Sequence, residues 1–263
     1  MALGTWRPPD DPTVHGTLTL RCDRLLEYRA RAEHAAGHRV TLTHLMVKIM
    51  GDVFREIPEA NRIVRWGRLY QREKVDVFVH VAMTDPTTGK LDLSGLVVRN
   101  ADARSLFDIA QEVESTVHRV RANDHGAMTQ SRRSFQKIPS FLVRPALNLM
   151  AFLTYTLNLD LSAIGVPKDA FGSLAITNVG ALGLDTAYVP LVPYTRLPVF
   201  IALGAVKEGP VVEDGALVVG RTLSIHVTFD HRIMDGSHAA QVVNAIKKRF
   251  ADPDGALGTI PPS

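Results

Sequence analysis

The chain has 263 residues, of which 46% are hydrophobic, and 30 basic against 27 acidic side chains give a formal net charge of +3. This balance, without a basic block, argues against a nucleic-acid-binding surface. The single cysteine, Cys22, excludes intramolecular disulfides and Cys-rich zinc sites and favours a cytoplasmic location. Residues 1–12 lack the apolar core of a signal peptide and are expected to form an irregular arm.

The first half of the chain predicts strands and helices in alternation. Val14–Leu20 alternates apolar and polar residues as a half-buried strand does. Asp23 is expected to cap a helix that ends at Gly37, and Thr43 a helix that ends before Pro58. Further elements are expected as strands at Arg62–Tyr70, Val75–Ala82 and Gly95–Val98, a turn at Thr84–Lys90, and a helix from Ser105 to Arg121.

The second half begins with a polar loop over 122–137 and an apolar segment over 140–166. Charged and polar residues interrupt that segment, so we expect a helical hairpin, buried or facing another subunit, and no transmembrane helix. Docking of this hairpin on a membrane surface is the alternative. The remaining expected elements are strands at Ser173–Asn178, Val199–Val206, Val211–Val219 and Leu223–Phe229, a helix at Ser237–Phe250, and a tail over 252–263.

Strands and helices are interleaved, but the late connections between strands are too short for helical crossovers. Such connections favour a mixed β-sheet with helices packed on it, a two-layer α+β sandwich. We expect one domain over residues 13–251.

The segment Ser224–Gly236, S-I-H-V-T-F-D-H-R-I-M-D-G, carries the strongest functional signal. It places His231 and Asp235 between a predicted strand and a glycine that permits a sharp turn. The free pKa of histidine lies near neutrality, so a strand-end histidine is suited to act as a general base. The alternative is a structural salt bridge at a strand end, with the histidine solvated.

The H-R-x-x-D-G string resembles the signature of the acyltransferase components of 2-oxo acid dehydrogenase complexes, relatives of chloramphenicol acetyltransferase. A second segment, Gly172–Gly183, is by itself only a strand followed by a glycine-assisted turn, but it is similar to the family string G-x-F-T-I-S-N-L-G. The two motifs occur in the family's order and spacing. With weaker matches at Val14–Arg31, Thr41–Arg55, Val75–Val81 and Ser94–Leu106, the resemblance covers about residues 13–251.

The resemblance implies acyl transfer between two thiols, those of coenzyme A and dihydrolipoamide. His231 would deprotonate the attacking thiol, Thr177 would donate a hydrogen bond to the tetrahedral oxyanion, and Asp235 would hold the histidine loop. Family members place this site between the subunits of a trimer. The resemblance therefore implies a homotrimer, with a 24-subunit cage of eight trimers as the alternative, and an inactive monomer.

The sequence departs from the family pattern in several places. We find no lipoyl attachment site, so either a lipoyl carrier would act in trans or the acyl acceptor is something else. Arg7 and Arg21 are candidates for the arginine that pairs with Asp235, and residues of about 137–168 are interpreted as an apolar insertion near the substrate channel. The lysines considered for coenzyme A phosphates are Lys137, Lys168 and Lys207.

Three functions follow in order of preference. The first is a dihydrolipoamide acyltransferase-like enzyme that uses acyl-coenzyme A. The second is a small-molecule O- or N-acetyltransferase of the chloramphenicol acetyltransferase type, and the third is a self-assembling core with a vestigial site. No metal is expected, because no zinc-ligand spacing such as H-E-x-x-H occurs.

Overall fold

The computed structural model describes residues 12–84, 91–121, 139–164, 166, 168–213 and 215–260. Six strands form one mixed sheet in the order β1-β8-β7-β6-β4-β5. Its strands are β1 (Thr13–Arg21), β4 (Val77–Thr84), β5 (Leu91–Val98), β6 (Leu174–Asn178), β7 (Val199–Glu213) and β8 (Ala216–Asp230). Strand β6 runs parallel to β4 and β7, and the other pairs are antiparallel.

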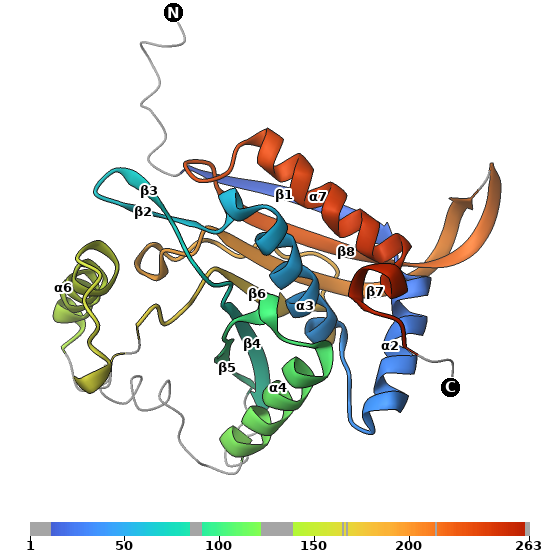
Figure 1. Ribbon diagram of the computed structural model, residues 1–263, viewed down its shortest axis with the longest axis horizontal. Coiled ribbons are helices and arrows are strands. Elements are labelled where there is room, and N and C mark those ends of the chain that lie inside the picture. The colour runs from blue at the N-terminus through green and yellow to red at the C-terminus, as the bar shows by residue number, and fades with distance from the viewer. Residues whose placement is uncertain are drawn as a thin grey trace, which may run out of the picture.

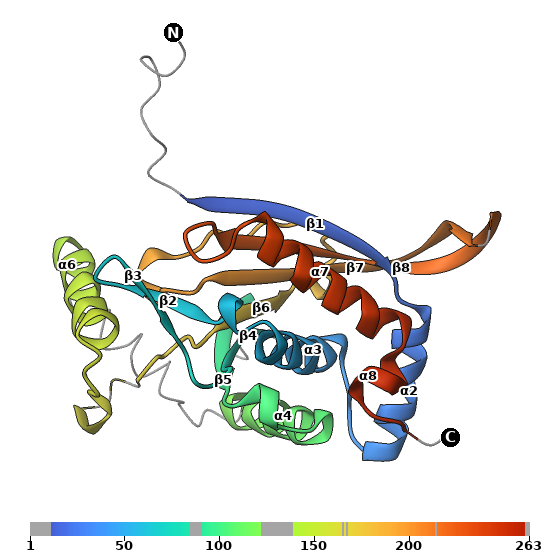
Figure 2. The same cartoon turned by 45° about the horizontal axis from the view of Figure 1, so that its top comes forward.

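Helices cover one face of this sheet, as Figures 1 and 2 show. They are α2 (Asp23–Ala36), α3 (Leu42–Glu56), α4 (Leu106–Arg121) and α7 (Gly236–Ala251). The main core lies between helices and sheet, where Val77, Ile176, Leu203 and Ile225 point toward the helices. The expected two-layer α+β sandwich with a mixed sheet is confirmed.

The opposite face carries the alternate residues of the same strands. Phe78, Ala175 and Phe200 form a small apolar cluster there with Leu197. Across β1 and β8 the same face is polar, because Thr17 is paired with His226 and His15 with Thr228. The loop between β6 and β7 contributes Tyr188, whose hydroxyl lies 2.5 Å from the Thr17 hydroxyl. We call this surface the loop-covered face.

Two helix starts differ from the sequence prediction. Helix α3 is capped by Thr41, whose side chain accepts from the His44 backbone N–H at 3.3 Å, and not by Thr43. Asp23 is the first residue of α2 and caps nothing. Its carboxylate instead accepts from the side chains of Arg21 and Arg221. The predicted end at Gly37 is confirmed, with the left-handed φ of 65° that favours glycine.

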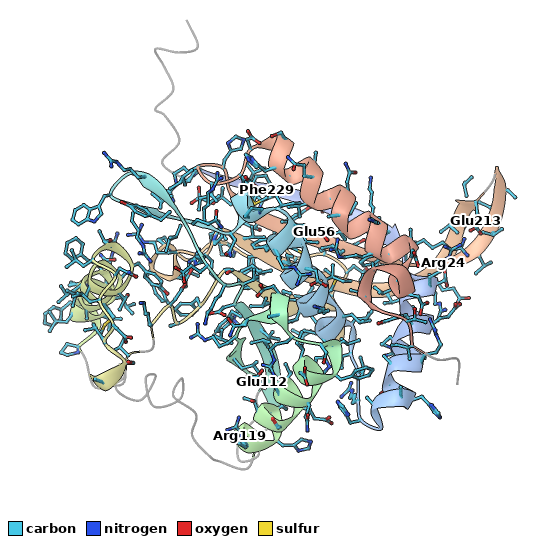
Figure 3. All side chains as sticks on the ribbon, in the orientation of Figure 1. Arg24, Glu56, Glu112, Arg119, Glu213 and Phe229 are labelled. Atoms are coloured by element: carbon cyan, nitrogen blue, oxygen red, sulfur yellow. The ribbon has the colours of Figure 1, made fainter. Side chains whose placement is uncertain are left out.

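The last three predicted strands form only two. Strands β7 and β8 make one long antiparallel hairpin whose pairing continues from Val199–Phe229 to Glu213–Ala216, with one irregularity between Leu203 and Val206. Figure 3 shows Glu213 and Phe229 at opposite ends of this hairpin. The outer part projects beyond the helices (Figure 2), and its Val212, Leu217 and Val219 are exposed.

The predicted strand Arg62–Tyr70 is a short hairpin of β2 (Arg62–Arg65) and β3 (Arg68–Gln71). Trp66 and Gly67 form its turn, both with positive φ. The predicted apolar helical hairpin is also wrong for the described residues. One helix, α6 (Ser140–Ala151), continues into a π-helical turn over Phe152–Thr156 and is followed by a short 3-10 turn. Figures 1 and 2 place α6 beside β2 and β3, away from the main helical layer.

The C-terminal segment packs against the domain. Helix α8 (Pro253–Leu257) lies next to α2. The Tyr28 hydroxyl donates to the carbonyl of Gly258 at 3.0 Å, and Arg31 donates to the carbonyl of Ile260 at 2.7 Å. The Ile260 side chain is 4% exposed and belongs to the main core. Residues 252–260 therefore form part of the folded domain.

Candidate active site

His231 lies in the turn directly after β8, at the end of the sheet near α6. Its backbone N–H donates to the carbonyl of Pro12 at 2.9 Å, which ties the turn to the start of β1. Its imidazole is exposed on one side and stacks near Phe229, with ring centroids 6.4 Å apart. An accessible imidazole held by a fixed backbone is suited to take a proton from a substrate thiol.

Asp235 lies at the N-cap of α7, and among the described residues its carboxylate is bound to Ser237 and His238 and not to His231. Its carboxylate accepts from the backbone N–H groups of Ser237 and His238 at 2.9 and 3.0 Å. The bond from the His238 backbone, and next the bond from the Ser237 hydroxyl, hold the pKa of Asp235 well below its usual range. The carboxylate therefore fixes the junction between the histidine turn and the helix.

Thr177 lies on β6 and points to the loop-covered face. It is half-buried and aligned with Ala202 on β7. The turn after β6 is held by Asn178, whose side chain accepts from the Ala181 backbone N–H at 3.0 Å. Gly180 then passes against the backbone of Gly204 and Ala205, where any Cβ would collide. The second glycine of the motif thus permits a close backbone approach.

Thr177 and His231 do not meet within one chain. Thr177 is aligned through Ala202 with His226, and β8 runs four residues further before it ends at Asp230. Four residues at a rise of 3.3 Å and two strand spacings of 4.8 Å place the Cα atoms of Thr177 and Asp230 roughly 16 Å apart. A hydroxyl and an imidazole acting on one carbonyl must lie within hydrogen-bond reach of it, so a single chain cannot supply both.

Neither arginine candidate is shown to pair with Asp235. Arg21 is bound to Asp23 at 2.8 Å and to Glu213, at the opposite end of β1. Arg7 lies outside the described residues. The ion pair of the histidine turn is instead formed by Asp230 and Arg232, whose Oδ2 and Nη2 atoms are 2.6 Å apart. Asp230 is buried, so this pair anchors the base of the turn.

The lysines considered for coenzyme A have different surroundings. Lys207 on β7 forms a salt bridge with Asp185, with 2.7 Å between Nζ and Oδ2. Lys168 follows the short turn after α6, and Lys137 lies outside the described residues. Their contact with coenzyme A stays a prediction.

Two further features escaped sequence reasoning. His80 follows Val79, which is aligned with Ile176, so His80 is the β4 neighbour of Thr177. Burial lowers the pKa of His80, and its ring stacks on Phe200 with centroids 5.5 Å apart. Strand pairing brings His80 next to Thr177. In the sequence alone, His80 is only a polar residue in an alternating run.

The second feature is a cavity of about 630 Å³ beside the histidine turn. It is bounded by Asp230, Arg232 and Ile233, by the loop 191–197, by the start of β1 and by α6. Since its walls come from segments far apart in sequence, no local pattern could predict it.

Other buried polar groups in this region are structural. The His226 ring contacts the Thr17 hydroxyl at 3.0 Å and the carbonyl of Asp185 at 2.9 Å. Across the described ranges, no three His, Cys, Asp or Glu side chains form a group that could hold a metal ion. Within the same ranges, no helix has the length and apolar character needed to cross a bilayer.

The mixed sheet, the strand-end histidine and the capped helix agree with the acyltransferase domain that the sequence resembles. The sequence pattern of the 2-oxoacid dehydrogenases acyltransferase catalytic domain matches residues 10–136 and 168–257. The chain therefore belongs to this family. Residues 137–167, which include α6, lie between the two matched ranges.

Curated relatives carry related names. The chain is 24% identical over 223 residues to the dihydrolipoyllysine-residue acetyltransferase component of the pyruvate dehydrogenase complex of Bacillus subtilis, covering 83% of this chain and 40% of the relative. It is 28% identical over 199 residues to the mitochondrial succinyltransferase component of the 2-oxoglutarate dehydrogenase complex of Saccharomyces cerevisiae, covering 76% and 33%. The chain thus spans less than half the length of these relatives.

Solved structures show the same fold. The cubic core of the pyruvate dehydrogenase multienzyme complex superposes with a TM-score of 0.68 at 20% identity, covering 94% of this chain and 85% of that chain. A probable dihydrolipoamide acetyltransferase from Listeria monocytogenes gives the same TM-score at 15% identity, covering 97% and 88%.

Proposed function

We propose that this chain transfers acyl groups between coenzyme A and a dihydrolipoamide thiol. Membership in the acyltransferase family and the exposed imidazole of His231 support this reaction. The lipoyl group would be presented by a lipoyl carrier.

The proposed chemistry needs one base and one oxyanion donor. His231 removes the proton of the attacking thiol, and the resulting thiolate adds to the thioester carbonyl. The Thr177 hydroxyl donates to the oxyanion of the tetrahedral intermediate. When the intermediate collapses, its carbon–sulfur bond to the first thiol breaks, and that thiolate recovers the proton from His231. No covalent enzyme intermediate is required.

One observation carries the arrangement of the site, namely the separation of roughly 16 Å between Thr177 and the end of β8, estimated from strand geometry. Both groups can act on one thioester only if His231 of one subunit meets Thr177 of the next. A cyclic trimer, with head-to-tail contacts, supplies such a site three times. A monomer is then inactive, and a 24-subunit cage of trimers would retain the same sites.

Mixing two inactive variants tests this arrangement. His231→Ala and Thr177→Val each remove one group, so each homotrimer is expected to lose at least 100-fold in kcat with acetyl-coenzyme A and free dihydrolipoamide. If the two are unfolded and refolded together, random trimers contain intact sites at about a quarter of their interfaces, since each interface is directional. Recovery toward about a quarter of wild-type activity is the expected result.

The control is a refolded mixture of two batches of His231→Ala, which contains no intact site. If the mixed variants stay as inactive as this control while wild type refolds to full activity, the intersubunit site is wrong. A wild-type chain inactive with acetyl, propionyl and succinyl thioesters of coenzyme A would contradict the proposed reaction itself. Light scattering on the wild-type protein separates a trimer from a cage.

A further inference from the structure

The cavity beside the histidine turn is lined partly by residues that match the family pattern and partly by residues that lie outside it. One wall is the turn itself, with Asp230 and Arg232 on either side of His231. Another wall is α6 with the start of its π-helical turn, through Asn148, Ala151 and Phe152, which lie between the two matched ranges. A volume of about 630 Å³ is typical of small-molecule sites.

The wall from α6 is packed firmly against the domain. Ala151 and Tyr155 are buried against Ile63 of β2, with Tyr194 of the loop packed on the same cluster. The Thr154 hydroxyl donates back to the carbonyl of Met150 at 2.8 Å within the helix. The cluster that Tyr155 shares with Tyr194 holds the end of α6 beside the 191–197 loop.

The charges around the cavity do not cancel. Asp230 is bound to Arg232 through three side-chain atom pairs of 3.2 Å or less. Arg196 also lines the cavity, and in the part of the chain that the structure describes its side chain forms no hydrogen bond or ion pair. Its Nε is buried without an acceptor. Because Arg196 lines the cavity without a carboxylate partner, an anion is the ligand that its guanidinium favours.

The rest of the lining is mostly apolar. The apolar side chains include Val64, Phe152, Leu191, Leu197 and Ile233. The ligand that suits these walls has an apolar body and one anionic end. A carboxylate is well matched to Arg196, because a guanidinium binds both of its oxygens.

We propose that this cavity is the acyl pocket and that it selects acyl groups with a terminal carboxylate, recognised by Arg196. This inference rests on the proposed function, since it places the thioester carbonyl at His231 and the acyl chain between α6 and the loop. The pocket walls contributed by α6 would then give this chain an acyl preference of its own.

A pair of thioesters that differ only in charge tests the pocket. Glutaryl-coenzyme A carries a free carboxylate, whereas its monomethyl ester is neutral and of similar shape. For wild type, kcat/KM with the free carboxylate is expected to exceed that with the ester by about tenfold or more, the range for a charged hydrogen bond. The Arg196→Met variant should reduce this ratio to about one, and Arg196→Lys should restore part of it. Arg119→Met, on α4 far from the cavity (Figure 3), is the matched control and should keep the wild-type ratio.

Each outcome bears on the proposal. A wild-type ratio near one, or a preference that survives in Arg196→Met, overturns it. An equal rise in KM for both thioesters in Arg196→Met would assign the anion to a phosphate of coenzyme A and would also overturn it. If Arg196→Met does not fold, Val192→Trp narrows the cavity from its half-exposed rim and should lower kcat/KM for glutaryl more than for acetyl thioesters; equal effects contradict the pocket.

Failure of the proposed function is distinguishable. If wild type turns over no thioester, saturation-transfer NMR with glutaryl-pantetheine still reports binding. A signal that disappears in Arg196→Met supports the pocket as a carboxylate site, and the same signal in both proteins overturns it.

Discussion

The carboxylate of Asp235 accepts from the backbone N–H of His238 at 3.0 Å, and so it closes the first turn of α7 directly after the histidine turn. The aspartate of the motif is therefore a helix cap in this structure. A capping role predicts that Asp235 positions the histidine turn and takes no part in proton transfer.

Substitutions of Asp235 should follow capping strength. Asparagine caps helices nearly as well as aspartate, whereas alanine does not. We expect Asp235→Asn to retain most of the melting temperature and of kcat, and Asp235→Ala to lower the melting temperature by about 2–4 °C. Thermal unfolding by circular dichroism and the acyl-transfer assay measure these changes. Loss of activity in Asp235→Asn with an unchanged melting temperature would instead show a chemical role for the carboxylate.

Stability should depend on pH through His44. Burial, and to a smaller extent the nearby Arg39 and His38, lower the pKa of His44 to about 4. Its Nδ1 accepts from the Thr41 backbone N–H at 3.3 Å, so the neutral form completes the capping box of α3. Because the unfolded chain binds a proton near pH 6.5 and the folded chain only near pH 4, stability from this group is complete above pH 6.5 and is lost as pH falls toward 4.

The expected loss between pH 6.5 and pH 4 is about 2 kcal/mol in the free energy of unfolding. Urea titrations at half-unit pH steps measure it. His44→Gln is the matched control, because glutamine at this position also completes a capping box but does not titrate. The same pH slope in wild type and His44→Gln would show that other groups are responsible.

The close packing of α3 against Ala101 predicts that Gly51 cannot be replaced by alanine without a loss of stability. A Cβ on Gly51 would lie 2.8 Å from the carbonyl carbon of Ala101 and 2.9 Å from the Asp102 nitrogen. We expect Gly51→Ala to destabilise the protein by about 1–3 kcal/mol, more than the helix propensity of alanine returns. Gly16→Ala on β1, where nothing lies within 4 Å of the added Cβ, should be close to neutral. Equal free energies of unfolding for the two variants would contradict this packing.

The docked C-terminal segment can be tested at Ile260. Its side chain is 4% exposed, whereas Val219 on the projecting hairpin is 70% exposed. Ile260→Ala should therefore lower the free energy of unfolding by about 2 kcal/mol or more, and Val219→Ala should change it little. Denaturant unfolding of both variants measures the difference. A neutral Ile260→Ala variant would mean that the segment does not pack on α2 in solution.

Sequence patterns predicted most helices and strands, because the spacing of buried residues within one element is visible in a short stretch of sequence. Alternation in Val75–Ala82 and helical spacing after Gly236 reflect burial on one face, and both elements are confirmed. Capping was less predictable, since Thr41 and Thr43 offer the same hydroxyl and only the chain geometry selects Thr41. The β7–β8 hairpin was predicted as three strands, because the apolar run Val211–Val219 hides the turn at Gly215 and the polar run before Val211 looks like a break.

The sequence by itself determined the family, the sandwich and the three candidate residues, because motif order and hydrophobic period are written along the chain. Tertiary structure alone decided that Thr177 and His231 lie far apart in one subunit, since their separation depends on the order and register of three strands. It also decided that Arg196 lines a cavity against α6. Such contacts join residues distant in sequence, and no local pattern encodes them.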